Sequence, residues 1–254
     1  MRRLFVFVLS LGILAAVTAC APQPLPVGPL VGDCAAAAAP GVDWHNCDKS
    51  GADLSGANLS GANLTGANLT GSVLTDAILA FAKLTNADLA NVSGLRTTLS
   101  YAILSGATLS GAYLPGVGLQ LADLTGANLA GAGLASAILT QANLTGSVLI
   151  MADLTDANLS GAYLVNADLR AANLSYADLS GANLSNANLT GVNLTIAILT
   201  GANLENANLR SANLTGAFLV TATGTPSPSG VSGILYDNTS CPSGMVVTNP
   251  ASCW

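Results

Sequence analysis

The sequence predicts a solenoid, in which one short repeat stacks on itself to form a narrow rod. Leu occupies every fifth position from Leu54 to Leu219, in 34 units of one register, and only Gly94 interrupts it. The position two residues before it is Ala in 28 of the 34 units, and its six exceptions are small or β-branched: Ser72, Val92, Thr97, Val117, Ser147 and Val192. Repetition of this regularity determines architecture before any other signal is considered.

Each position of the repeat has a physical role in such a rod. Side chains alternate along extended backbone, so Leu and the small residue two positions earlier can both point inward. Gly or Asn at the last position, as in Gly56, Gly61, Asn186 and Asn206, suits a tight turn. At Gly94 the register continues, which predicts a bulge or a loosened face; a binding notch is the alternative.

The N-terminus is typical of an export signal of 1–19. Arg2 and Arg3 precede an apolar stretch, which is too short to span a membrane, and small residues lead to Cys20. Val17-Thr18-Ala19-Cys20 resembles a bacterial lipobox, in which Cys20 becomes the first residue and carries a diacylglycerol. We therefore expect a protein anchored to a membrane on its extracytoplasmic side; plain secretory cleavage at the same bond is the alternative.

Composition shifts divide the rest of the chain into five segments. A Pro-rich segment at 20–32 is the expected tether, 33–50 a short N-terminal cap, and 51–221 the repeat. A linker rich in Thr, Ser, Pro and Gly follows at 222–233, and 234–254 forms a small C-terminal element.

The remaining cysteines are Cys34, Cys47, Cys241 and Cys253, an even number that suits disulfides in an oxidising compartment. Three pairings are possible. Distance along the repeat favours the two local ones, Cys34 with Cys47 and Cys241 with Cys253. A metal site is the rival interpretation, although no CxxC pair is present and His45 is the only histidine. We expect no metal and no cofactor.

Units such as Ala57-Asn58-Leu59-Ser60-Gly61 and Ala182-Asn183-Leu184-Ser185-Asn186 resemble the pentapeptide-repeat family, whose pattern is A(D/N)LXX. The resemblance covers about two-thirds of the chain. It implies an all-β fold, a right-handed quadrilateral β-helix with four units per coil, here closed by small disulfide-bonded caps. At about 4.8 Å per coil, 34 units would make about 8.5 coils and a rod about 40 Å long.

With four units per coil, residues 20 apart stack in a column. Phe81, Tyr101 and Leu121 share one column, and Ile78 and Ile138 lie in the column beside it. These five residues form a candidate contact surface, since contiguous apolar patches often mark interfaces. Alternatively, they shield the backbone at corners of the coil.

No group of residues predicts catalysis. His45 beside Trp44 fits a capping role, and the outward Asp residues stand where other units carry Asn. No Lys/Arg cluster exists to bind nucleic acid. The sequence thus favours a non-enzymatic, exported lipoprotein whose rod is an envelope structural element or interaction scaffold, with a protein partner or self-association. Some members of the family protect DNA gyrase by imitating DNA. That mode needs dense acidic columns, whereas residues 51 to 221 hold nine acids and four bases. An enzyme of unknown type is a third alternative.

Overall fold

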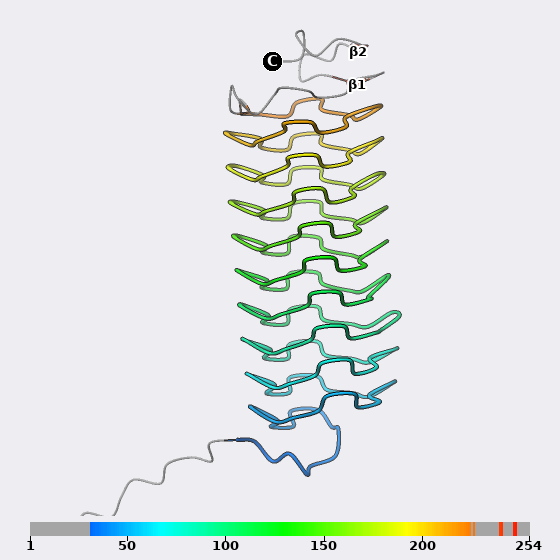
Figure 1. The fold of residues 1–254 in the computed structure, drawn as a ribbon, viewed down its shortest axis with the longest axis vertical. Helices are drawn as coiled ribbons and strands as arrows, with labels where there is room; N and C mark the ends of the chain where they lie inside the picture. The colour runs from blue at the N-terminus through cyan, green and yellow to red at the C-terminus, as the bar shows by residue number, and fades with distance from the viewer. Residues whose placement is uncertain (1–30, 225, 227–238, 241–245, 248–254) are drawn as a thin grey trace, which may run out of the picture. The chain divides into compact units, whose positions relative to one another are not determined.

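The computed structural model describes residues 31–224, 226, 239–240 and 246–247. Residues 31–224 contain a right-handed quadrilateral β-helix, seen in Figure 1 as a stack of nearly identical coils. Parallel bridges join each residue just before a Leu to the residue 20 positions later, from Asp43↔Asn63 to Asn203↔Thr223. Each coil therefore has four sides of five residues, as the family resemblance implies. The sides are single bridges, because five residues leave room for only a short extended segment between corners.

The backbone hydrogen bonds repeat with the same period. In the unit around Leu54, the amides of Leu54 and Gly56 donate to the carbonyls of Val73 and Thr75 on the next coil. The amide of Ala57 closes the corner by donating to the Leu54 carbonyl at 3.0 Å. Most backbone donors are satisfied in this way, which is the requirement for a stable solenoid.

Many units carry Asn or Asp before Leu, and this side chain completes the pattern. Asp53 accepts the amide of Ser55 through Oδ1 at 3.0 Å, and the same contact recurs in many units. Asn side chains also bridge coils, as where Asn63 Nδ2 donates to Asp43 Oδ1 at 2.9 Å. The outward acids therefore serve the turns of the repeat, in the manner of Asx turns.

The core is a column of Leu and Ala, as predicted. Leu59 to Leu219 at the central positions are fully buried, and the Ala positions beside them are buried from Ala62 onward. The stability of the β-helix depends on the packing of each coil against the next, because each coil contacts only its neighbours.

Every corner adopts a left-handed conformation. From Gly41 to Thr221, each fifth residue has a φ between 55° and 69°, and 17 of these 37 corners are Gly. Left-handed backbone is disfavoured for residues with a Cβ, which explains the preference for Gly and Asn at the end of the unit.

Gly94 keeps the register but loosens one corner. Its amide still donates to the Tyr113 carbonyl at 2.9 Å, whereas the Arg96 amide is 3.5 Å from the Pro115 carbonyl. Residues 95–96 form a bend in place of the usual turn. The Thr97 hydroxyl fills the vacant centre and donates to the Leu74 carbonyl at 2.8 Å. This agrees with a loosened face, and no notch opens because Gly94 and Thr97 are both buried.

The coil begins at residue 41, earlier than the boundary at residue 51 that we expected. Trp44 occupies a central Leu position and is 2% exposed, and Cys47 occupies an Ala position. Residues 41–50, assigned from sequence to the N-terminal cap, are thus the first two sides of the helix. Near the other end of the chain, β1 (Thr239–Ser240) pairs antiparallel with β2 (Val246–Val247).

Candidate interaction surface

The candidate contact surface predicted from sequence lies along one corner of the helix. Phe81, Tyr101 and Leu121 are corner residues on three successive coils, and 45–62% of their surface is exposed. The Phe81 and Tyr101 rings stack with centroids 4.8 Å apart. Ile78 and Ile138 lie on the side that precedes this corner and are also exposed.

The structure adds Ile103, which sequence analysis missed. Ile103 is 40% exposed and lies on the side that follows the same corner. It occupies the outward position that carries Asn in other units, so the 20-residue column rule that selected Ile78 would have found it. We call the six residues the apolar strip: Ile78, Phe81, Tyr101, Ile103, Leu121 and Ile138.

A second group of exposed apolar residues was also missed. It lies near the C-terminal end of the helix, at the neighbouring corner and further along the side column of Ile78 and Ile138, and consists of Tyr176, Ile196, Ile198, Phe218 and Val220. The 20-residue spacing of Tyr176 and Ile196, and of Ile198 and Phe218, is the signal that would have identified it.

A shallow depression of about 320 Å³ continues from the strip. Leu121, Asp123, Gln141, Asn143 and Tyr163 line it. Asp123 is held by its own turn, because its Oδ1 accepts the Thr125 amide at 3.1 Å and the Thr125 hydroxyl at 2.6 Å. The depression thus lacks the paired acid and base that hydrolytic catalysis requires.

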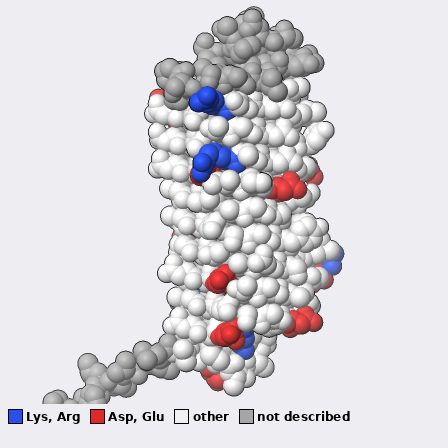
Figure 2. All heavy atoms as spheres, viewed as in Figure 1, with Lys and Arg blue, Asp and Glu red and all other residues white. Residues whose placement is uncertain are grey.

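Charged residues are sparse on the helix. Two of its arginines, Arg96 and Arg170, form ion pairs with Asp residues. Figure 2 shows scattered acidic and basic side chains, some of them adjoining, on a face that is otherwise uncharged. Arg96 makes a two-pronged contact with Asp76 on the preceding coil, at 2.8 Å for each pair of atoms. Arg170 binds Asp168 at 2.7 Å, and this hydrogen bond lowers the pKa of the Asp168 carboxyl. Exposed pairs of this kind contribute little to stability.

The N-terminal end of the core is closed by a compact cap. Cys34 and Cys47 form the predicted disulfide, with Cα atoms 5.4 Å apart. The Trp44 indole donates to the Ala36 carbonyl at 3.1 Å. Lys49 stands at the next central position, with its ammonium 3.8 Å from the centre of the Trp44 ring and 2.8 Å from the Cys34 carbonyl.

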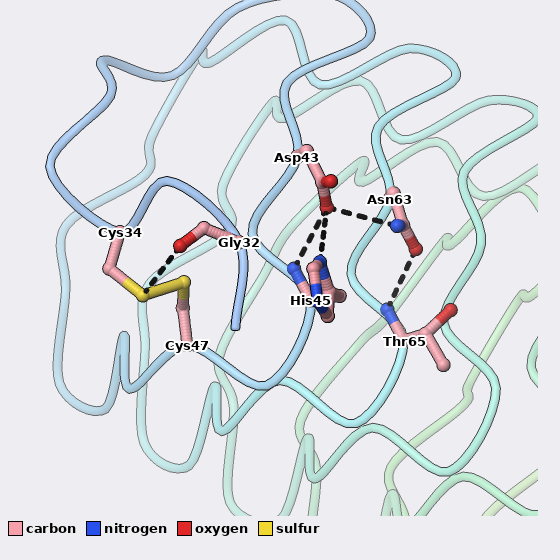
Figure 3. A network of polar contacts seen from close by, with 7 residues as sticks. All are labelled: Gly32, Cys34, Asp43, His45, Cys47, Asn63 and Thr65. Atoms are coloured by element: carbon pink, nitrogen blue, oxygen red, sulfur yellow. Dashed lines mark hydrogen bonds and ion pairs between the residues drawn. A yellow bond between two sulfur atoms is a disulfide. The ribbon is translucent and has the colours of Figure 1, made fainter. Parts of the chain in front are cut away.

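Polar contacts around Asp43 extend this cap onto the next coil (Figure 3). Asp43 Oδ1 lies 2.8 Å from His45 Nδ1 and accepts from the His45 amide and from Asn63 Nδ2. The hydrogen bond with the His45 side chain is the main reason that the pKa of Asp43 is lowered. This is consistent with the capping role expected for His45. In the described part of the chain, no three His, Cys, Asp or Glu side chains converge to hold a metal ion.

The other predicted sites are the remaining three cysteines. Cys20, Cys241 and Cys253 lie outside the described residues. Within those that are described, no helix has the length and apolar character needed to cross a bilayer.

Comparison with known proteins agrees with this geometry. The family model for pentapeptide repeats matches in eight copies, over residues 33–66, 52–91, 77–116, 95–131, 127–162, 152–191 and 187–223. No curated protein matches the chain.

Several solved structures are similar to the chain. HetL, a pentapeptide repeat protein involved in heterocyst differentiation regulation in the cyanobacterium Nostoc sp. strain PCC 7120, is 35% identical. That match covers 80% of this chain and 90% of HetL, with a TM-score of 0.45. A trypsin-treated form of QnrB1, a plasmid-mediated fluoroquinolone resistance protein, is 17% identical over 75% of this chain and 87% of its own, with a TM-score of 0.54. A pentapeptide repeat protein from the thylakoid lumen of Arabidopsis thaliana is 33% identical over 42% of this chain and 83% of its own, with a TM-score of 0.37.

Proposed function

Because the chain belongs to the pentapeptide-repeat family, we propose that it is a non-enzymatic, exported lipoprotein that presents its β-helix as a rigid scaffold for protein contact. The observation that carries this proposal is the apolar strip. Its six side chains project from a rod whose core is already filled by Leu and Ala. They are therefore not needed to bury the interior.

The corner residues of the strip lower the stability of the fold. Phe81, Tyr101 and Leu121 have φ values of 59°, 61° and 56°. Left-handed backbone costs a residue with a Cβ roughly 1–2 kcal/mol, which Gly avoids. Most corners carry Gly or Asn, whereas these three successive corners of one column carry bulky residues.

The strip also replaces polar residues that support the turns. Ile78, Ile103 and Ile138 stand where Asn or Asp accepts the amide two residues later, and an Ile side chain cannot accept it. Residues that depart from local structural rules without benefit to the core concentrate at functional sites. This supports a contact surface over mere shielding of the backbone.

Photocrosslinking in the native host tests the contact. A photoreactive residue at position 101 should yield a discrete protein adduct, whereas the same residue at position 181, in the same corner column, should not. Absence of any protein adduct at position 101, or equal adducts at both positions, would count against the surface.

Export and anchoring are proposed from the first 20 residues. Cleavage before Cys20 would leave a sulfur available for a diacylglycerol, and stable anchoring takes two or more acyl chains. The intact mass of the protein extracted from host membranes should show a chain that starts at Cys20 and carries acyl groups. The variant Cys20→Ser should lose that mass and leave the membrane fraction. An unmodified, freely soluble wild-type protein would contradict the proposal.

The DNA-mimicking alternative is not supported by the arrangement of acids. From residue 41 to residue 224, no Asp or Glu lies directly above another on the next coil. Asp76 is followed by Arg96 in its column, and Asp123 by Asn143. A continuous acidic stripe like that of a phosphate backbone is therefore missing from the described helix. The likeness to QnrB1 is at 17% identity and concerns the fold alone.

A further inference from the structure

We propose that the apolar strip is the interface of an antiparallel homodimer, in which it packs against the same strip of a second copy. This inference rests on the proposed function, because it names the partner of that contact surface. The argument comes from two charged residues at the edge of the strip and from the order of residues along it.

Lys83 and Asp123 lie at equal distances on either side of Ile103. The three residues share one column, on successive coils, through the bridges Lys83↔Ile103 and Ile103↔Asp123. Lys83 is exposed, and its ammonium forms no ion pair with a described residue. The hydrogen bonds that Asp123 accepts from Thr125 and Asn143 fall on Oδ1, so Oδ2 is available to a cation from outside the described helix.

A two-fold axis fixes which residues meet. Consider an axis that is perpendicular to the rod, lies in the plane of the interface and passes through the coil of Tyr101 and Ile103. Each column of one copy then faces the same column of the other copy, with the coils in reverse order. Lys83 of each copy then faces Asp123 of the other, and the pair occurs twice. A parallel two-fold would instead set Lys83 level with Lys83. Isologous contact with complementary charges therefore selects the antiparallel arrangement.

All residues of the apolar strip except Ile138, which comes level with Asn58 of the second copy, meet an apolar or small residue under the same operation. Phe81 faces Leu121 of the second copy, and Tyr101 meets its own equivalent. Ile78 comes level with Gly118 of the second copy, because Ile78, Thr98 and Gly118 are successive members of one column. A large side chain thus faces a position without one, which permits close packing.

The position of the strip also suits two anchored chains. Asp43 lies three coils before Ile103, so the N-terminal ends of the two helices would be six coils apart. At about 4.8 Å per coil this is roughly 29 Å. Two rods lying along one membrane surface could both be tethered to it.

Charge exchange provides the test. Sedimentation equilibrium of the full-length chain in detergent should show a dimer. Lys83→Asp and Asp123→Lys should each weaken the dimer by roughly tenfold or more, because each places like charges face to face. Asp123→Lys removes the hydrogen bonds that Asp123 accepts from Thr125, but Lys83 shows that this column accepts Lys, and thermal unfolding by circular dichroism will verify that the variant folds.

Mixing the two single variants should restore a dimer between them, and the double variant should dimerise as the wild type does. Both products again pair unlike charges. Ile196→Asn, a change at an exposed apolar corner outside the strip, should leave the dimer unchanged.

Two results would overturn the inference. One is a wild-type chain that stays monomeric at high micromolar concentration. The other is a dimer that Lys83→Asp and Asp123→Lys do not weaken, or that mixing does not rescue. In either case, a protein adduct at position 101 in the host would preserve the contact surface and assign it a different partner. Loss of both signals would reject the surface itself.

Discussion

The layer at Gly94 allows a precise test of how the core is packed. A Cβ placed on Gly94 would lie 2.3 Å from the Thr97 hydroxyl oxygen and 3.1 Å from atoms of both Leu74 and Leu114. Thr97 thus occupies the space that Leu fills in the other units. The effects on stability of substitutions at Gly94 and Thr97 should therefore depend on each other, because the two residues share the same space.

The magnitudes follow from these contacts. Gly94→Leu alone overpacks the layer and should destabilise the protein by about 1–3 kcal/mol. Thr97→Ala alone loses the hydrogen bond to the Leu74 carbonyl and leaves a void, at a cost of about 1 kcal/mol. The double variant restores the regular Ala and Leu positions and buries a Leu, which contributes about 1.5–3 kcal/mol. The double variant should therefore be at least as stable as the wild type, with a coupling free energy on the order of 3 kcal/mol.

Urea unfolding of the four proteins, followed by circular dichroism, measures this coupling. Repeat proteins can unfold in parts, so the comparison requires that the slope of the unfolding free energy with urea be the same for all four proteins. If the effects of the two substitutions add to within about 0.5 kcal/mol, the two sites are independent and the assignment of Thr97 to the vacant centre is wrong.

Three further outcomes are expected. Leu144→Asp should unfold or severely destabilise the helix, because it places an unpaired charge in a dry core. Tyr101→Ser, at an exposed position, should change the unfolding free energy by no more than about 1 kcal/mol. Equal losses of stability would show that the inward and outward positions are misassigned. Reduction of the bond between Cys34 and Cys47 should increase amide exchange in the first coils before the middle ones, and uniform exchange would contradict a local capping role. Hydrogen bonds from Ser50, chiefly its amide, lower the pKa of Asp48, so the native state binds fewer protons than the unfolded chain. The stability that Asp48 provides is complete above its unfolded pKa of about 3.9, and it is lost as the pH falls through the lower pKa of the folded state. Asp48→Asn should therefore make the first coil less sensitive to acid, as measured by its amide exchange. An unchanged pH profile would reject the assignment.

The repeat could be predicted in detail because its period is local. Leu and Ala every five residues specify which side chains are buried, and Gly or Asn at the end of the unit specifies the left-handed corners. The number of units in a coil does not follow from the period and came from the family resemblance. The start of the helix was misplaced because Trp44 and Lys49 do not look like Leu, although both stand in its register.

The contact surface was predicted only in part for a related reason. The prediction used one corner column, where bulky residues such as Phe81 stand out against Gly, and one side column, that of Ile78 and Ile138. Ile103 and Phe218 occupy outward positions on the sides, which are diverse in this chain and give a weaker signal. The sequence analysis combined the corner column with the side that precedes it, whereas the structure shows that Ile103, on the side that follows, is exposed beside the same corner.

The central claim is that the apolar strip is retained for contact and not for the fold. Its most direct test is the unfolding free energy of Leu121→Asn, measured with the association of the same variant. Asn is common at left-handed corners of this helix, as at Asn86 and Asn91, whose φ is 55°. The account predicts unchanged or slightly greater stability, because strain at φ 56° is relieved, together with weakened association. A loss of stability of more than about 1 kcal/mol with association intact would show that the strip serves the fold alone.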